Sequence, residues 1–268
     1  MIDALTSHLI DAAVVLGLAV VAPLALGRWR RWALAAGLAA LALTLPRGAA
    51  AGLVAAGPAA IAALGLHRQI AAAEPIKYWC RDDIVRVLAG TWALVATGAL
   101  VASRSGLTLF GIGEPIVELT AVHYLFAGVG ALTLAGTTRS TVAVTITAAA
   151  PPVVAIGFVT AWAAPQVGGA VLMAIGVFVI AALELRAAIA DRRSPWSRRA
   201  LLAISGLAVW APMFFAVAWA AGQHWNVPAL SVPAMVRWHG APNAIGFVIA
   251  GLAAARMHIP ARRVTACA

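Results

Sequence analysis

Long apolar stretches dominate the chain, and short breaks carrying arginine, proline or glycine separate them. A helix that crosses the hydrocarbon core of a bilayer, about 30 Å thick, takes roughly 20 apolar residues. Cut at the breaks, the pattern predicts nine helices, at about residues 8–26, 32–46, 49–66, 84–102, 115–136, 141–163, 167–189, 200–221 and 233–257. A transmembrane β-barrel is excluded, because its strands need alternating polar residues, which stretches such as 49–66 lack.

The boundary between the second and third stretches, at Arg47 and its neighbours, is the weakest, and fusing the two would leave eight spans. Basic residues in short loops remain on the cytoplasmic side of a membrane. Counted over alternate breaks, sixteen of the nineteen basic residues fall on one side, while Arg47, Arg104 and Arg237 fall on the other. This asymmetry favours nine spans, with the N-terminus outside and the C-terminus in the cytoplasm.

Composition agrees with a membrane protein, since 63% of the residues are hydrophobic, 10% are charged and the mean hydropathy is +0.95. The net charge of +10 is divided among short clusters beside apolar stretches, where arginines contact lipid headgroups, so no nucleic acid partner is expected. No basic residue precedes Arg28, which favours a first span over a signal peptide. We therefore expect an all-α integral membrane protein with one transmembrane helical domain, residues 1–268.

The ratio of arginine to lysine indicates the kind of organism that encodes the chain. Lys77 is the only lysine against eighteen arginines, and alanine is abundant. Both features are typical of a GC-rich bacterial genome, so the expected location is the bacterial cytoplasmic membrane. The oligomeric state is left open.

Two polar-dense segments, residues 113–124 and 235–247, interrupt the apolar pattern. Polar groups inside a bilayer are costly, so each one requires an explanation. At a rise of about 1.5 Å per residue, Glu118, His123, His239 and Asn243 all fall in the outer half of the predicted bundle, which permits one shared pocket.

The angular positions of these residues differ. Glu118 and His123 are five residues apart, about 140° around a helix, so they do not share a face. His239 and Asn243 stand at i and i+4 and do share one, and Pro242 between them predicts a kink in the helix.

Structural roles compete with catalytic ones. Glu118 could be an acid placed at a helix start by the helix dipole, and the two histidines could form hydrogen bonds between helices. Glu184, close to the end of its stretch, is expected to reach the interface or to pair with Arg186.

No cofactor motif is visible, and no cofactor or metal is expected. Cys80 and Cys267 are too few for a zinc site. A metal set of His123, His239 and Glu118, or a haem held between the two histidines, is left as a minor alternative.

The segments ELTAVHYLFAG, starting at Glu118, and HGAPNAIGF, starting at His239, resemble the YndJ-like family of polytopic bacterial membrane proteins. A Leu-Thr-Ala-Val-His run and a later His-Gly-x-x-Asn-Ala-x-Gly-Phe run recur in that family. The resemblance implies that Glu118, His123, His239 and Asn243 form a site, and it implies no particular chemistry.

The leading hypothesis is an intramembrane enzyme that uses general acid–base chemistry on a lipophilic substrate, by cyclisation, isomerisation or epoxide opening of a terpenoid or polyene. Glu118 is the expected acid, and His123 and His239 orient it or take the proton back. The substrate-binding residues are predicted to be Asn243, Tyr124, Thr120 and Trp238. The alternative is a proton-coupled transporter in which Glu118 and the histidines relay protons. Expected partners are the lipophilic small-molecule substrate and membrane lipid.

Overall fold

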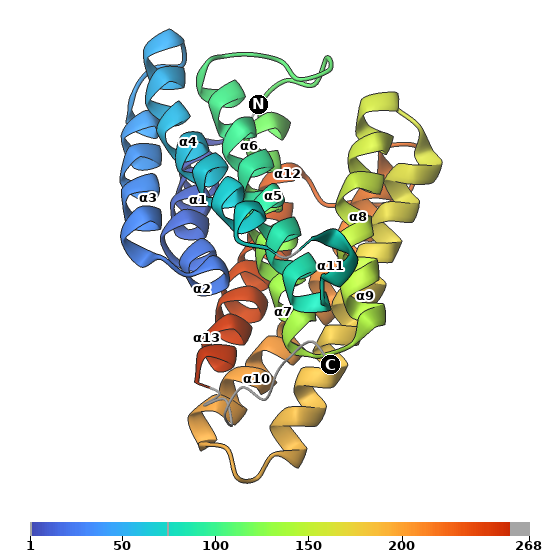
Figure 1. Cartoon of the computed structure of the whole chain (residues 1–268). Coiled ribbons are helices and arrows are strands. Elements are labelled where there is room, and N and C mark those ends of the chain that lie inside the picture. Colours follow the sequence, from blue (N-terminus) through green and yellow to red (C-terminus); the bar gives the residue numbers. More distant parts are fainter. Residues whose placement is uncertain (1, 74, 258–268) are drawn as a thin grey trace.

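The computed structural model describes residues 2–73 and 75–257, and within them the chain forms nine helices joined by loops, of which the one between α5 and α6 is long (Figure 1). The helices are α1 to α2 (Ala4–Leu26), α3 (Trp29–Thr44), α4 (Ala49–Ala71), α5 (Arg81–Arg104), α6 to α7 (Ile116–Thr137), α8 (Thr141–Thr160), α9 (Ala163–Ala190), α10 to α11 (Trp196–Gly222) and α12 to α13 (232–256). Each lies within a few residues of a predicted stretch. The second and third stretches are the separate helices α3 and α4, so the two are not fused into one helix.

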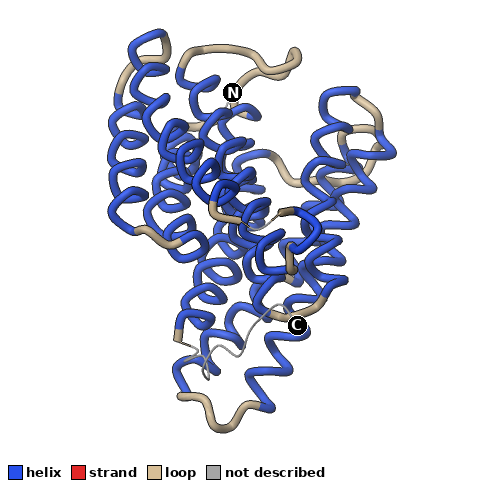
Figure 2. The backbone as a smooth tube through the Cα atoms, in the orientation of Figure 1, coloured by secondary structure: helices blue, strands red, loops and turns tan. Residues whose placement is uncertain are grey.

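Several of these helices are composite. Their parts are α1 (Ala4–Leu16), α2 (Ala22–Leu26), α6 (Ile116–His123), α7 (Leu132–Thr137), α10 (Trp196–Ala208), α11 (Trp210–Gly222), α12 (Val232–Met235) and α13 (Ala250–Arg256). The segments that join them in three helices are π-helical: η1 (Gly17–Val21), η3 (Tyr124–Ala131), η4 (Val236–Gly240) and η5 (Pro242–Ile249). A 3₁₀ turn, η2 (Ile76–Tyr78), precedes α5, and Figure 2 shows that loops are confined to the ends of the helices.

Seven of the nine described helices are long and apolar enough to cross a membrane. The other two are α3, which has 16 residues, and the last helix (232–256), which carries Arg237, His239 and Asn243. The chain is therefore an integral membrane protein. Arg262, Arg263 and Cys267, which entered the sequence argument, lie outside the described residues.

The fifth helix (Ile116–Thr137) lies at the centre, where its segment η3 contacts α5, η1 and η5. Glycines permit this close packing. A Cβ atom at Gly128 would lie 2.8 Å from the Cβ of Trp92, and one at Gly130 would overlap the side chain of Val248. The three helices that contain π-helical segments thus contact one another, and they supply all of the predicted site residues. The pair α8 and α9 packs to one side of them (Figure 1).

Candidate functional site

The structure brings the two polar-dense segments together at His123 and His239. Their imidazole rings are stacked, with 6.3 Å between centroids and 19° between planes. His123 is the last residue of α6, and His239 lies in the π-helical segment η4 of the last helix. The His123 side chain is exposed on the surface of the described bundle, and that of His239 is half-buried. The histidine pair is therefore accessible from the outer surface of the helix bundle.

Both rings are held through the same nitrogen. His123 Nδ1 lies 2.9 Å from the carbonyl oxygen of Leu119, and His239 Nδ1 lies 2.8 Å from that of Pro212. A carbonyl oxygen only accepts hydrogen bonds, so Nδ1 carries the proton in each neutral ring. The lone pair is then on Nε2, which has no partner among the described residues in either ring. Two bases, each oriented by the main chain, stand side by side.

Asn243 accompanies His239, as their i and i+4 positions predict. Its Nδ2 lies 3.2 Å from His239 Nδ1 and 3.7 Å from the sulfur of Met213. Its Oδ1 is buried and has no donor within the described part of the chain. Because the Nδ1 proton of His239 is directed to the Pro212 carbonyl, the Asn243 amide nitrogen, which is also a donor, lies beside the ring without a hydrogen bond to it.

Glu118 lies apart from the histidines, in the first turn of α6. Its side chain is buried, and Oε2 lies 2.9 Å from Nη2 of Arg47 in the turn between α3 and α4. Asp11 of α1 is close enough to interact with the same carboxyl group, and Glu114 Oε2 lies 3.8 Å from Arg47. No interaction in the described residues links Glu118 to either histidine. The predicted site is thus divided into a histidine pair and an acidic cluster around Arg47.

Sequence reasoning missed Asp11 and Arg47 as members of this cluster. Asp11 is an acid inside the first apolar stretch, and that position was itself a signal. Arg47 was assigned only to a loop. Its 71-residue separation from Glu118 left the pairing invisible in the sequence.

The remaining predicted residues have different surroundings. The Thr120 hydroxyl donates to the carbonyl of Ile116 at 2.8 Å, so it is satisfied within its own helix. The Tyr124 ring packs on Trp92, with 5.3 Å between centroids and 46° between planes. Trp238, which precedes His239 in the last helix, is 63% exposed.

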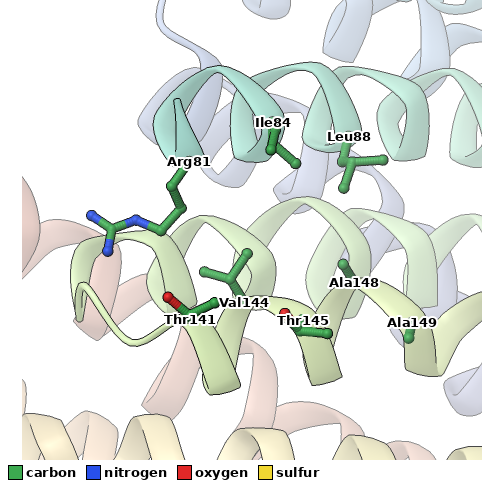
Figure 3. Close-up of a pocket in the computed structure, with 8 residues that line it drawn as sticks. All are labelled: Arg81, Ile84, Leu88, Thr141, Val144, Thr145, Ala148 and Ala149. Atoms are coloured by element: carbon green, nitrogen blue, oxygen red, sulfur yellow. The ribbon is translucent and has the colours of Figure 1, made fainter. Parts of the chain in front are cut away.

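Grooves on the molecule lie elsewhere. One of about 480 Å³ runs between α5 and α8, with Arg81 at one end and apolar side chains along it (Figure 3). Another of about 590 Å³ lies beside Trp219 and the loop that follows α11. None of the predicted site residues lines either groove. In the described residues no group of three or more His, Cys, Asp or Glu side chains is arranged to hold a metal ion.

Comparison with known proteins gives a family. The family model described as YndJ-like protein matches residues 12–247, most of the chain and both polar-dense segments. No curated protein and no solved structure matches the chain. The match agrees with the resemblance of the two motifs, and the chain belongs to the YndJ-like family.

Proposed function

We propose that the chain is an intramembrane enzyme that isomerises a lipophilic substrate by general acid–base chemistry at His123 and His239. The observation that carries the proposal is the stacked pair of imidazoles, each bonded through Nδ1 to a carbonyl and each with an Nε2 that has no partner in the part of the chain that the structure describes. One Nε2 removes a proton from the substrate and becomes an imidazolium. The same imidazolium then gives this proton to another atom of the substrate, so both rings end as neutral imidazoles. The reaction needs no net proton and no redox partner.

The exposure of the site supports a substrate that is dissolved in the bilayer. His123 is exposed on a helix long and apolar enough to span the membrane, and Trp238 next to His239 is also exposed. A polar ring facing lipid is costly unless something polar reaches it, and a terpenoid or polyene with one oxygen would do so. Asn243 and Tyr124 are the residues we assign to binding that oxygen.

We assign proton transfer to the histidines rather than to Glu118. Glu118 is engaged by Arg47 at 2.9 Å and is buried in the acidic cluster. We assign it a positioning role, because it joins the start of α6 to the turn between α3 and α4 and thereby sets the direction of the helix that ends at His123. A cyclisation or epoxide opening that needs Glu118 as the acid has less support.

Solvent deuterium tests the proposal for any substrate that exchanges a proton at the site. Membranes that contain the chain are incubated in deuterated water, and the extracted lipids are analysed by mass spectrometry. A proton that passes through an imidazole exchanges with solvent, so one lipid class should gain deuterium only when the chain is present. His239→Gln should abolish the gain, and the exposed His67→Gln on α4 should not. Full deuterium uptake in the His239→Gln membranes would remove the proposal.

We further propose nine membrane spans in a bacterial cytoplasmic membrane, with the N-terminus outside and the C-terminus in the cytoplasm. The support is the distribution of basic residues in short loops. A reporter fused after Ala268 should then be cytoplasmic, and one inserted between Gly222 and Val232 should be external. Finding both reporters on one side would contradict this arrangement.

A proton-coupled transporter is the second candidate, and one observation favours it. Glu184 of α9 is a second buried carboxyl group, far along the bundle from Glu118, so acids lie near both ends. Acidification of vesicles that contain the purified chain, driven by a gradient of a lipophilic solute, would support transport. Deuterium uptake by a lipid without such flux would support the enzyme.

A further inference from the structure

A buried carboxyl group on α9 lies outside the histidine site, and the proposed isomerase does not use it. Glu184 is 4% exposed, and its Oε2 lies 2.6 Å from the hydroxyl oxygen of Ser205 on α10. The same hydroxyl oxygen lies 2.8 Å from the main-chain oxygen of Phe247, in the π-helical segment η5 of the last helix. One serine thus connects three helices, and Ser205 itself is fully buried.

The number of hydrogens available to Ser205 determines the protonation state of Glu184. A serine hydroxyl has one hydrogen, and a carbonyl oxygen can only accept. Ser205 therefore donates to Phe247 or to Glu184, but not to both. Both short distances are satisfied only when a second hydrogen is present, and the carboxyl group of Glu184 is the one partner that can carry it.

We propose that Glu184 is a proton-binding site, in which the neutral carboxylic acid donates to Ser205 and Ser205 donates to the Phe247 carbonyl. The site does not depend on the proposed enzyme activity. When the proton leaves, the Ser205 hydroxyl turns to the carboxylate and the Phe247 carbonyl loses this bond. Proton binding at Glu184 is then coupled to the contact between α10 and the last helix, the helix that also carries His239.

Within residues 2–73 and 75–257, no charged group faces Glu184 from the elements packed around it. The described helices α7, α8 and α11 contain no charged residue. On α10, Arg198 bonds Asp191 and Arg199 bonds the Ala188 carbonyl. On α9 itself the Arg186 side chain is exposed.

The basic groups of the last helix are also engaged elsewhere. Arg256 bonds the Leu24 carbonyl, Arg237 lies 3.7 Å from Asp3, and His239 bonds the Pro212 carbonyl. A carboxylate at Glu184 would therefore be buried without a counter-charge, whereas a neutral acid needs none.

Two glycines shape the site. A Cβ atom at Gly251 would lie 2.7 Å from the Ser205 hydroxyl oxygen and 2.9 Å from Glu184 Oε1. A Cβ atom at Gly206 would lie 2.7 Å from the Ala181 carbonyl oxygen. Glycine on each facing helix therefore lets the backbones approach until the three polar groups meet.

Infrared spectroscopy of the purified protein tests the proposal. At neutral pH the wild type should show the carbonyl stretching band of a protonated carboxylic acid, shifted in deuterated water. Glu184→Gln should lose this band, and Ser205→Ala should shift it, because the acid loses its acceptor. Glu114→Gln, at a partly exposed acid, should leave the band unchanged. The Ser205→Ala spectrum decides the question if Glu184→Gln does not fold. A wild-type spectrum in which no protonated acid band responds to either substitution would overturn the proposal.

Discussion

The histidine pair and the Glu184 site differ in whether their polar atoms are hydrogen-bonded. At His123 and His239 each Nδ1 is bonded, while each Nε2 is left without a partner on an exposed face. At Glu184 the carboxyl, the Ser205 hydroxyl and the Phe247 carbonyl bond one another in a fully enclosed site. A closed network holds helices together, whereas an open nitrogen lone pair is available to a ligand.

The two regions share the last helix. His239 and Phe247 are eight residues apart, about 12 Å along the axis. The intervening stretch is mostly π-helical, a form that occurs often at functional sites. In our proposals one helix therefore has two roles: His239 near its start acts as a base, and Phe247 further along accepts a bond that depends on the protonation of Glu184.

The strongest test of this separation compares His239→Gln with Glu184→Gln. Loss of a catalytic base lowers turnover by about 10²- to 10⁴-fold, so deuterium uptake should fall by that factor in the first variant. Gln at position 184 retains a donor for Ser205, so the second variant should remain within a few-fold of wild type. Initial rates of uptake in equal amounts of folded protein provide the measurement. Equal losses of deuterium uptake in the two variants would indicate that the two regions act as one site.

The next largest expected effect is the loss of stability on substitution of Gly251. Gly251→Ala places a methyl group against Ser205 and Glu184, and overpacking of this kind costs about 1 to 3 kcal/mol of stability. Gly168→Ala on α9 is the matched control, since nothing lies within 4 Å of its Cβ position. That control should leave stability unchanged or raise it by up to about 1 kcal/mol. Thermal unfolding in detergent distinguishes them, and equal melting temperatures would contradict the close approach.

Asn243→Ala should have a smaller effect on stability. Asn243 Nδ2 donates to the sulfur of Met213 on α11 at 3.7 Å, and a hydrogen bond between membrane helices contributes about 0.6 to 1.7 kcal/mol. Deuterium uptake should fall by more than this loss of stability implies, because we assign Asn243 to binding the substrate oxygen. The exposed Asn226→Ala provides the control. If uptake falls only as far as the folded fraction falls, Asn243 is a packing residue alone.

The smallest expected effect is at Asp191, in the loop between α9 and α10. The Ser194 hydroxyl, and then Arg198, hold the pKa of this carboxyl group below its usual value. A lowered folded-state pKa stabilises the fold above the unfolded pKa of about 3.9, and the benefit disappears as the pH falls through the folded value. Asp191→Asn should therefore lower the melting temperature slightly at pH 7 and leave it unchanged at the acid end. A difference in melting temperature that is the same at every pH would contradict a lowered pKa of Asp191.

The sequence predicted the helices well and their contacts poorly. The predicted stretch at about 115–136 corresponds to Ile116–Thr137, because an apolar run and its polar ends are local features. Glu184 was expected to reach the interface or pair with Arg186, and this is wrong, since it is buried against Ser205. Position around a helix predicts a face, but it does not name the helix that covers that face.

The candidate site was predicted in the same uneven way. Depth along two helices placed His123 and His239 at one level, and the structure stacks their rings. The same argument grouped Glu118 with them, although Glu118 faces α1 and the turn that carries Arg47. Depth is a one-dimensional quantity, so it cannot distinguish two sides of a helix.

Sequence alone was enough to assign the all-helical membrane class, to locate the nine helices of the described residues to within about five residues, and to find the residues that are too polar for an apolar span. These properties depend on hydropathy and on charge, which act locally. Only the tertiary structure decided which polar groups meet. Arg47 reaches Glu118, two imidazoles stack, and Ser205 stands between Glu184 and Phe247, because helix packing brings together residues that are distant in the chain.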